Sequence, residues 1–247
     1  MKGTGTLLLI PWHIGHRGDV TLNALSAARR LRVFLTEDAG ETRFQLGEVL
    51  RVDCSGKEFL TIPTFRDDVF LEKAIALLRQ EDVGLISSGG VPCFSDPGGW
   101  LVREARARGV PVVALAGASA LTTLLSLSGY DWIVDPKTRS FRFLFFAVGD
   151  GGRLREALGV EGEPVVVFLD QMDRKLLEEC LRTVAESDGE RSISVFFDMT
   201  KVPKSKFPYA NEVRSLSARD WRDFFRSVRW ESVSDASLLI HPGGAAR

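Results

Sequence analysis

Three loops rich in small residues could let a ligand approach the backbone closely. They span residues 11–19, 87–98 and 116–120, and each follows a short apolar run that is typical of a buried strand. Glycine, alanine and serine leave space that larger side chains would fill. One such loop fits an ordinary tight turn, but three at neighbouring strand ends favour a binding site, because ligands of open α/β sheets lie beyond the carboxyl ends of the strands.

A pair of acidic residues follows another predicted strand. Glu37 and Asp38 come directly after the run Val33–Thr36. A carboxylate there could take a proton from a reacting hydroxyl, and Asp38 is our candidate for this general base. The alternative is a structural role at the start of a helix. Asp96, which precedes Pro97, is expected to shape its loop or to cap the next helix.

Several common sites are absent from the sequence. No GxGxxG follows a predicted strand, and neither GxxxxGK[ST] nor GxSxG occurs, which argues against the commonest NAD, ATP and serine-hydrolase sites. The three cysteines are widely spaced, and His13 and His16 lack further ligand residues nearby, so we expect no metal. The apolar run Leu7–Ile10 is too short to span a membrane, and we expect a soluble, cytoplasmic protein.

The elements that must position these residues alternate between strand and helix. The chain has 247 residues, 45% of them hydrophobic, and a net charge of −1, so it is no polycation. Strands at 6–10, 33–36, 83–87 and 110–115 alternate with helices that include one at 42–50 and one capped by Asp19. A second set of strands and helices follows a polar stretch at 131–142. We predict two α/β domains, 1–118 with a mostly parallel sheet and 119–247 with a mixed sheet.

The motifs resemble those of the tetrapyrrole methylase superfamily. The segment 5–25 reads GTLLLIPWHIGHRGDVTLNAL and is similar to the opening of that superfamily, closest to its ribosomal small-subunit methyltransferase I branch. Residues 95–98 (SDPG) and 117–120 (GASA) resemble two later motifs of the branch. The resemblance covers most of residues 5–130 and thins after that.

The resemblance implies S-adenosylmethionine bound in a cleft between two α/β domains, in a protein that forms a homodimer. The cofactor would then contact a set of residues from both domains: Pro11, Ser87, Ser88, Gly89, Gly90, Val91, Phe94, Ser119, Ala120, Leu169 and Ala236. On this view a side chain at Gly90, as in Gly90→Val, should block the cofactor at little cost in stability.

The sequence indicates the cofactor more clearly than it indicates the molecule that accepts the methyl group. The resemblance favours methylation of a ribose 2′-hydroxyl in 16S rRNA, with the 30S subunit as partner, and Lys201, Lys204 and Lys206 form a basic stretch that could meet phosphates. However, the branch has Thr-Pro where this chain has Trp12-His13, and Asp-Ala where it has Ser88-Gly89. A small-molecule methyltransferase acting on a corrin or porphyrin precursor, and a degenerate non-catalytic cofactor-binding protein, therefore stay open as alternatives.

Overall fold

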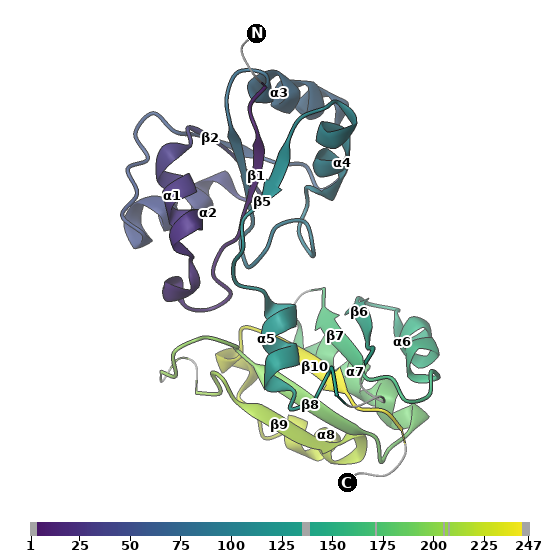
Figure 1. Cartoon of the computed structure of the whole chain (residues 1–247). Coiled ribbons are helices and arrows are strands. Elements are labelled where there is room, and N and C mark those ends of the chain that lie inside the picture. Colours follow the sequence, from purple (N-terminus) through teal and green to yellow (C-terminus); the bar gives the residue numbers. More distant parts are fainter. Residues whose placement is uncertain (1–3, 135–138, 171, 205, 207, 244–247) are drawn as a thin grey trace. The chain divides into compact units, whose positions relative to one another are not determined.

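A parallel five-stranded sheet organises the first part of the chain in the computed structural model, which describes residues 4–134, 139–170, 172–204, 206 and 208–243 (Figure 1). The chain divides into two compact units, residues 1–120 and 121–247. The strand order in the first sheet is β3-β2-β4-β1-β5, and every pairing is parallel. These strands are β1 (Leu7–Ile10), β2 (Val33–Thr36), β3 (Glu58–Thr61), β4 (Val83–Ile86) and β5 (Val112–Ala114).

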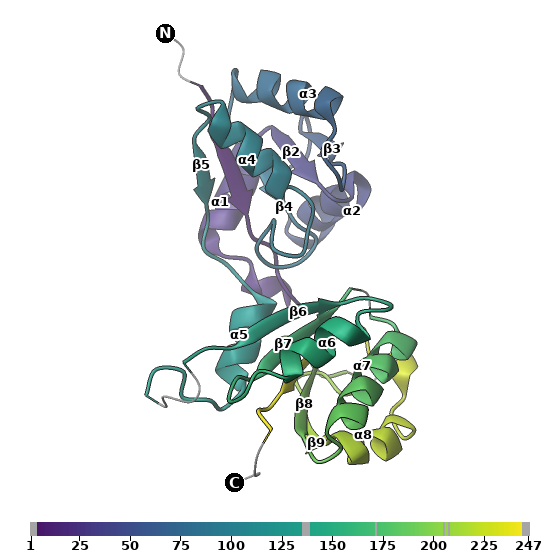
Figure 2. The same ribbon diagram turned by 90° about the vertical axis from the view of Figure 1, so that its right-hand side faces the viewer.

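Helices cover both faces of this sheet, which is why its central strands are apolar runs without alternation. On one face α3 (Asp68–Leu78) and α4 (Gly99–Ala107) bury Leu71 and Leu101 among strand side chains. On the other face lie α1 (Leu22–Arg30), α2 (Ala39–Phe44) and the π-helix η2 (Gln45–Val49), which buries Leu46. In Figure 2, α4 lies in front of the sheet and α1 behind it.

Two predicted helix boundaries of this unit are wrong. Asp19 does not cap α1; it ends a 3-10 helix (η1, Arg17–Asp19), and Thr21 accepts the capping hydrogen bond from the Ala24 amide at 3.2 Å. The predicted helix at 42–50 is also not one helix. It begins earlier, at Ala39, where Asp38 supplies the cap, and it widens into the π-helix from Gln45 onward.

The second unit contains a mixed sheet, as predicted. Its order is β6-β7-β10-β8-β9, with β6 and β7 parallel and the other pairs antiparallel. One helix layer packs on it and buries Trp221, whose indole donates a hydrogen bond to the Ile193 carbonyl at 2.9 Å. The elements are α5 (Ala120–Leu127, beginning at the unit boundary), β6 (Arg142–Phe146), α6 (Gly151–Leu158), β7 (Val165–Leu169), α7 (Arg174–Ser187), β8 (Ser192–Phe197), β9 (Val213–Ser217), α8 (Ala218–Phe225), η4 (Trp230–Ser232) and β10 (Ala236–Ile240).

The α/β class and the two kinds of sheet are therefore confirmed. Part of the predicted linker at 131–142 lies outside the described residues. Among the described residues, no helix is both long enough and apolar enough to span a bilayer.

Candidate functional site

The three small-residue loops and the acidic pair meet at one edge of the first sheet. The strands β2, β4, β1 and β5 are neighbours in that order and all run parallel, so their carboxyl ends share an edge. Glu37 and Asp38 follow β2, the loop 87–98 follows β4, the loop 11–19 follows β1, and residues 115–119 follow β5. This edge is where ligands of open α/β sheets bind.

Hydrogen bonds tie these loops to each other. The Trp12 amide donates to the Gly90 carbonyl at 2.7 Å, and the Ser87 hydroxyl donates to the same carbonyl at 2.8 Å. The Thr21 hydroxyl reaches the Ala116 carbonyl at 3.2 Å. The loops after β1, β4 and β5 therefore form a single preorganised surface.

Glycine is required at two places on this surface. Gly90 has a φ of +71°, and a Cβ there would lie 3.2 Å from Ile14 Cγ2 and 3.3 Å from the Ala118 carbonyl. A Cβ at Gly117 would lie 2.2 Å from Pro11 Cγ, so only glycine allows the loops after β1 and β5 to touch. The expectation that Gly90→Val costs little stability is therefore wrong, because valine would be both strained and crowded.

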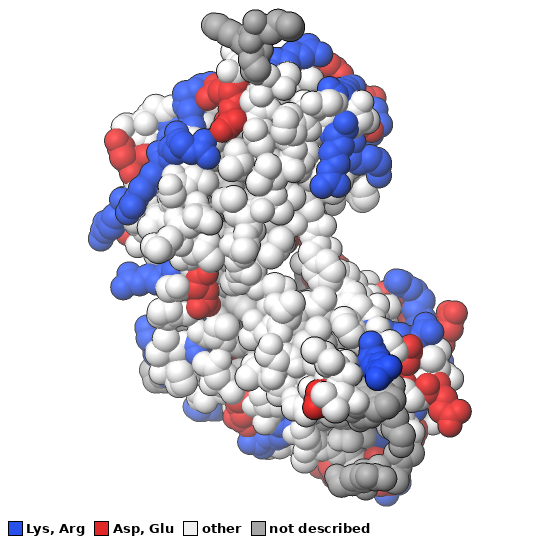
Figure 3. Space-filling model, viewed as in Figure 1, with Lys and Arg blue, Asp and Glu red and all other residues white. Residues whose placement is uncertain are grey.

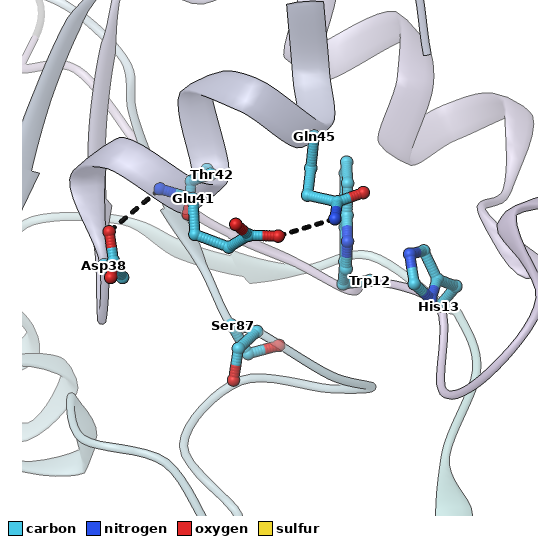
Figure 4. Close-up of a pocket in the computed structure, with 8 residues that line it drawn as sticks. Trp12, His13, Asp38, Glu41, Thr42, Gln45 and Ser87 are labelled. Atoms are coloured by element: carbon cyan, nitrogen blue, oxygen red, sulfur yellow. Dashed lines mark hydrogen bonds between the residues drawn. The ribbon is translucent and has the colours of Figure 1, made fainter. Parts of the chain in front are cut away.

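A small pocket of about 60 Å³ opens beside these loops. Figure 4 shows Glu41 and Gln45 of the helix pair α2–η2 facing Trp12 and His13, with Ser87 nearby. The pocket is lined by residues of three segments: Trp12, His13, Asp38, Glu41, Thr42, Gln45, Ser87 and Ser88.

Asp38 lines this pocket and also caps a helix. Its Oδ1 accepts a hydrogen bond from the Glu41 amide at 2.9 Å, which makes it the N-cap of α2. Asp38 therefore has the structural role at the start of a helix that was the alternative to a general base. Its side chain is exposed, and it stays our candidate for contact with an acceptor hydroxyl.

Glu37 connects the loop after β4 to the end of β2. It accepts hydrogen bonds from the hydroxyl and the amide of Ser88, at 2.9 and 3.2 Å. Burial, and then the neighbouring Glu37 carboxylate, raise the pKa of Asp96 to about 7. No group in the described chain hydrogen-bonds to the buried Oδ2 of Asp96, which agrees with a carboxyl that favours its protonated form. Asp96 does not cap α4, whose N-cap is Gly98.

The sequence of this chain matches the model of one protein family over most of its length. The model of the tetrapyrrole (corrin/porphyrin) methylases matches residues 6–204, which is most of the chain and includes every loop described above. The chain belongs to this family.

Two curated relatives of this methylase come from the ribosomal branch. This chain is 31% identical to the ribosomal RNA small subunit methyltransferase I of Leptospira biflexa, in an alignment that covers 84% of this chain and 82% of that relative. Over 82% of this chain and 87% of the relative, it is 29% identical to the enzyme of the same name from Thermotoga maritima. The sequence resemblance to this branch is thereby confirmed.

Solved structures share the fold of the methylase at low sequence identity. Uroporphyrin-III C-methyl transferase from Thermus thermophilus, complexed with S-adenosyl homocysteine, superposes with a TM-score of 0.56 at 18% identity and covers 96% of this chain and 97% of its own. Cobalt precorrin-4 methyltransferase superposes with a TM-score of 0.64 at 12% identity, and the match covers 96% of this chain and 94% of that enzyme. These likenesses show the fold.

The predicted cofactor residues of the methylase fall into two groups. One group lies in the first unit at the sheet edge: Pro11, Ser87, Ser88, Gly89, Gly90, Val91, Phe94, Ser119 and Ala120. In the second unit Leu169 ends β7 and Ala236 begins β10, each one residue beyond the paired residues Phe168 and Ser237, so these two predicted residues lie at one edge of the second sheet.

The three predicted phosphate-binding lysines differ in their surroundings. Lys201 Nζ lies 2.6 Å from the carboxylate of Asp198, whose side chain is fully buried, and it also hydrogen-bonds to the Ser234 hydroxyl. Lys204 and Lys206 are exposed. Lys201 thus has a structural role that its sequence neighbourhood did not reveal. On the face seen in Figure 3, charged side chains of both signs lie mainly around the margin of each unit.

Sequence reasoning missed part of the pocket. His13 was considered only as a metal ligand, and Glu41 and Gln45 were not singled out. The described residues contain no group of three or more His, Cys, Asp or Glu side chains that could hold a metal ion. The available signal was the replacement of the branch's Thr-Pro by Trp12-His13, because a new imidazole at a ligand-facing strand end changes the chemistry available there.

Proposed function

We propose that this chain is an S-adenosylmethionine-dependent methyltransferase that methylates ribosomal RNA of the small subunit, at a ribose 2′-hydroxyl. The observation that carries the proposal is similarity over more than four fifths of the chain to enzymes named for this substrate. A small-molecule acceptor has less support, because the corrin and porphyrin enzymes that share the fold are only 12–19% identical. A non-catalytic role has less support as well, because the sheet-edge loops and a polar pocket are all present.

The residues of the first unit fit the cofactor. A folded ligand that carries a sulfonium charge needs close backbone approach and carbonyl oxygens rather than an anion-binding nest. Gly89 offers such an approach, since a Cβ there would meet only the His13 carbonyl, at 3.8 Å. The proposed holders in this unit are the nine sheet-edge residues, from Pro11 to Ala120, and those in the second unit are Leu169 and Ala236. When bound, the cofactor supplies an activated methyl group.

The protein's own contribution is to hold the acceptor hydroxyl in line with that methyl group and to keep water away. Orientation of this kind accounts for a large part of the rate in group transfer. The loops are already tied together by the hydrogen bonds of Trp12, Ser87 and Thr21, so little ordering is left to occur on binding. Asp38 at the pocket wall would contact the acceptor hydroxyl.

The RNA would be held by basic side chains of the second unit. Lys204 and Lys206 are exposed and would contact phosphates, whereas Lys201 is held by Asp198. A homodimer, which the family resemblance implies, and a cytoplasmic location, which the widely spaced cysteines favour, are further parts of this proposal.

Two measurements test the proposed function. Purified 30S subunits that lack small-subunit rRNA methylation are incubated with the protein and methyl-labelled cofactor, and we expect label in a ribose 2′-O position of 16S rRNA. Calorimetry with S-adenosylhomocysteine on well-folded protein should show binding. Binding without any transfer would point to a non-catalytic protein, and transfer to a porphyrin precursor but not to 30S subunits would point to the small-molecule alternative.

A further inference from the structure

We propose that His13 is the proton acceptor for the methyl-accepting hydroxyl, and that Gln45 and Glu41 hold its imidazole in place. This inference rests on the proposed methyltransferase function and assigns a catalytic residue to it. His13 lies in the loop after β1 and lines the pocket together with both partners.

The helix pair places an oriented amide beside the imidazole. Gln45 Nε2 donates to Glu41 Oε1 at 2.6 Å, which fixes the orientation of the amide. The carbonyl oxygen of Gln45 is then on the side of His13, as Figure 4 shows, and the Gln45 side chain favours the charged form of the imidazole. In the arrangement we propose, one ring N–H donates to Gln45, which leaves the other ring nitrogen to accept a proton.

The local helix geometry explains why Glu41 and Gln45 lie together. Glu41 and Gln45 are four residues apart, so they lie on one face of the helical segment. Gln45 is the first residue of the π-helix η2, and π-helical turns are frequent at functional sites. Leu46, the next residue, is fully buried in the core and anchors this segment.

Burial of the His13 side chain favours the neutral imidazole. Burial lowers the pKa of His13 below its usual 6.5, while Asp19 and the hydrogen bond to Gln45 raise it in part and His16 lowers it slightly. Two carboxylates also line the pocket, those of Asp38 and Glu41. A neutral imidazole near pH 7 is the form that can accept a proton.

The position of His13 relative to the proposed cofactor loop supports the assignment. The residue before it, Trp12, donates its amide to Gly90, and the His13 carbonyl is the atom nearest to a Cβ built on Gly89. His13 therefore lies beside the loop 87–91. Of the other bases at the pocket wall, Glu41 is engaged by Gln45 and Asp38 uses one oxygen to cap α2.

The step balances without a further reactant. The acceptor oxygen forms a bond to the methyl carbon as the carbon–sulfur bond of the donor breaks, and the electron pair of that bond goes to sulfur. The hydroxyl proton goes to the free ring nitrogen of His13, and the imidazolium then returns it to solvent.

The test uses the full-length protein, 30S subunits and three variants. His13→Gln removes the base, Gln45→Leu removes the positioning contact, and His16→Gln is the matched control. His16 is in the same loop but exposed, and its Nδ1 accepts a bond from the Gly18 amide at 3.1 Å. Each variant is checked for folding by circular dichroism and for affinity toward S-adenosylhomocysteine by calorimetry.

We expect the kcat of the parent to rise with pH below pH 6.5, which gives the pH profile an acidic limb, and then to level off. His13→Gln should lower kcat by about a hundredfold or more and remove this limb, with S-adenosylhomocysteine affinity unchanged. Gln45→Leu should lower kcat about tenfold and move the limb to lower pH, because the lost hydrogen bond supported the imidazolium. His16→Gln should resemble the parent.

The outcomes separate this inference from the proposed function. If the parent methylates 30S subunits and folded His13→Gln keeps both its kcat and its acidic limb, the assignment of His13 is overturned and the methyltransferase function stands. If the parent transfers no methyl group to 30S subunits, the proposed function fails, and the role of His13 toward an RNA hydroxyl is overturned with it.

Discussion

Ser88 holds Glu37 with two hydrogen bonds, one from its hydroxyl at 2.9 Å and one from its backbone amide at 3.2 Å. This pair joins the loop after β4 to the end of β2, across the edge where we place the cofactor. On its other side Glu37 lies beside the half-buried Asp96 carboxyl. The loop that carries Ser88 is thus held by an acidic pair, and its stability should depend on whether that pair holds a proton.

The first prediction concerns this proton. The pKa of Asp96, about 7 in the fold, lies above its unfolded value of 3.8, so its contribution to stability is complete below pH 4 and lost as pH rises through 7. Asp96→Asn should remove that dependence, because its amide can donate to Glu37 at any pH. Relative to this variant, we expect the parent to lose about 2 kcal/mol of unfolding free energy between pH 5 and pH 8, less than the full shift implies because the group is partly exposed.

Urea denaturation of both proteins at the two pH values measures this difference. Other titrating groups are common to both proteins and cancel in the comparison. Identical pH dependence in parent and variant would show that Asp96 is already ionised in the fold.

The second prediction separates two neighbouring glycines. A Cβ at position 89 would meet only the His13 carbonyl, at 3.8 Å, whereas a valine at position 90 must adopt a φ of +71°. Gly89→Val should therefore keep the stability of the parent within about 1 kcal/mol but weaken S-adenosylhomocysteine binding at least tenfold by filling the loop. Gly90→Val should lose about 2 kcal/mol or more of unfolding free energy.

Calorimetry and urea denaturation measure the two effects. Gly99→Val is the matched control, because nothing lies within 4 Å of a Cβ at that position, and it should leave ligand affinity unchanged. Undiminished binding by stable Gly89→Val would remove the loop 87–91 from the cofactor site.

The third prediction concerns the basic stretch. Lys201→Ala leaves the fully buried Asp198 carboxylate without its cation and should cost about 2 kcal/mol or more of unfolding free energy. Lys204 is exposed and pairs with no carboxylate among the described residues, so Lys204→Ala should change stability by less than about 0.5 kcal/mol. If Lys204 contacts a phosphate, the salt slope of RNA binding should fall by about one in that variant.

Filter binding to 30S RNA over a range of salt concentrations measures the slope. Lys204→Ala is the informative variant, because replacing all three lysines together would mix an RNA effect with the loss of the Asp198 pair. An unchanged slope would mean that Lys204 makes no phosphate contact.

Much of the fold could be predicted because its central strands are short, continuous apolar runs. Val33–Thr36 and Val83–Ile86 are buried along their whole length, and such runs are recognisable without tertiary information. The strands β3 and β9 were missed. Both lie at sheet edges and carry mixed sequences, EFLT and VRSLS, in which hydrogen-bond pairing rather than apolar content makes the strand.

The site could be predicted only where composition carries the signal. Loops of small residues are visible in the sequence, and the structure brings the loops after β1, β4 and β5 into contact. The approach of Gln45 to His13 could not be predicted, because it depends on a π-helical turn and brings together segments about 30 residues apart. Likewise, the pairing of Lys201 with Asp198 involves a positive φ at Asp198 and the complete burial of its side chain, and neither can be recognised from the local sequence.

The last prediction sets Asp38 against His13. Asp38 caps α2 through the Glu41 amide, and asparagine caps a helix as well as aspartate does, so Asp38→Asn should keep the stability of the parent within about 0.5 kcal/mol. Asp38→Ala should cost about 1 kcal/mol, because it removes the cap. If His13 takes the proton, Asp38→Asn should keep kcat on 30S subunits within about threefold and retain the acidic limb of the pH profile. Methyl transfer measured between pH 5 and pH 8 decides between the two residues: a hundredfold loss in the folded Asn variant, with His13→Gln still active, would make the Asp38 carboxylate the base.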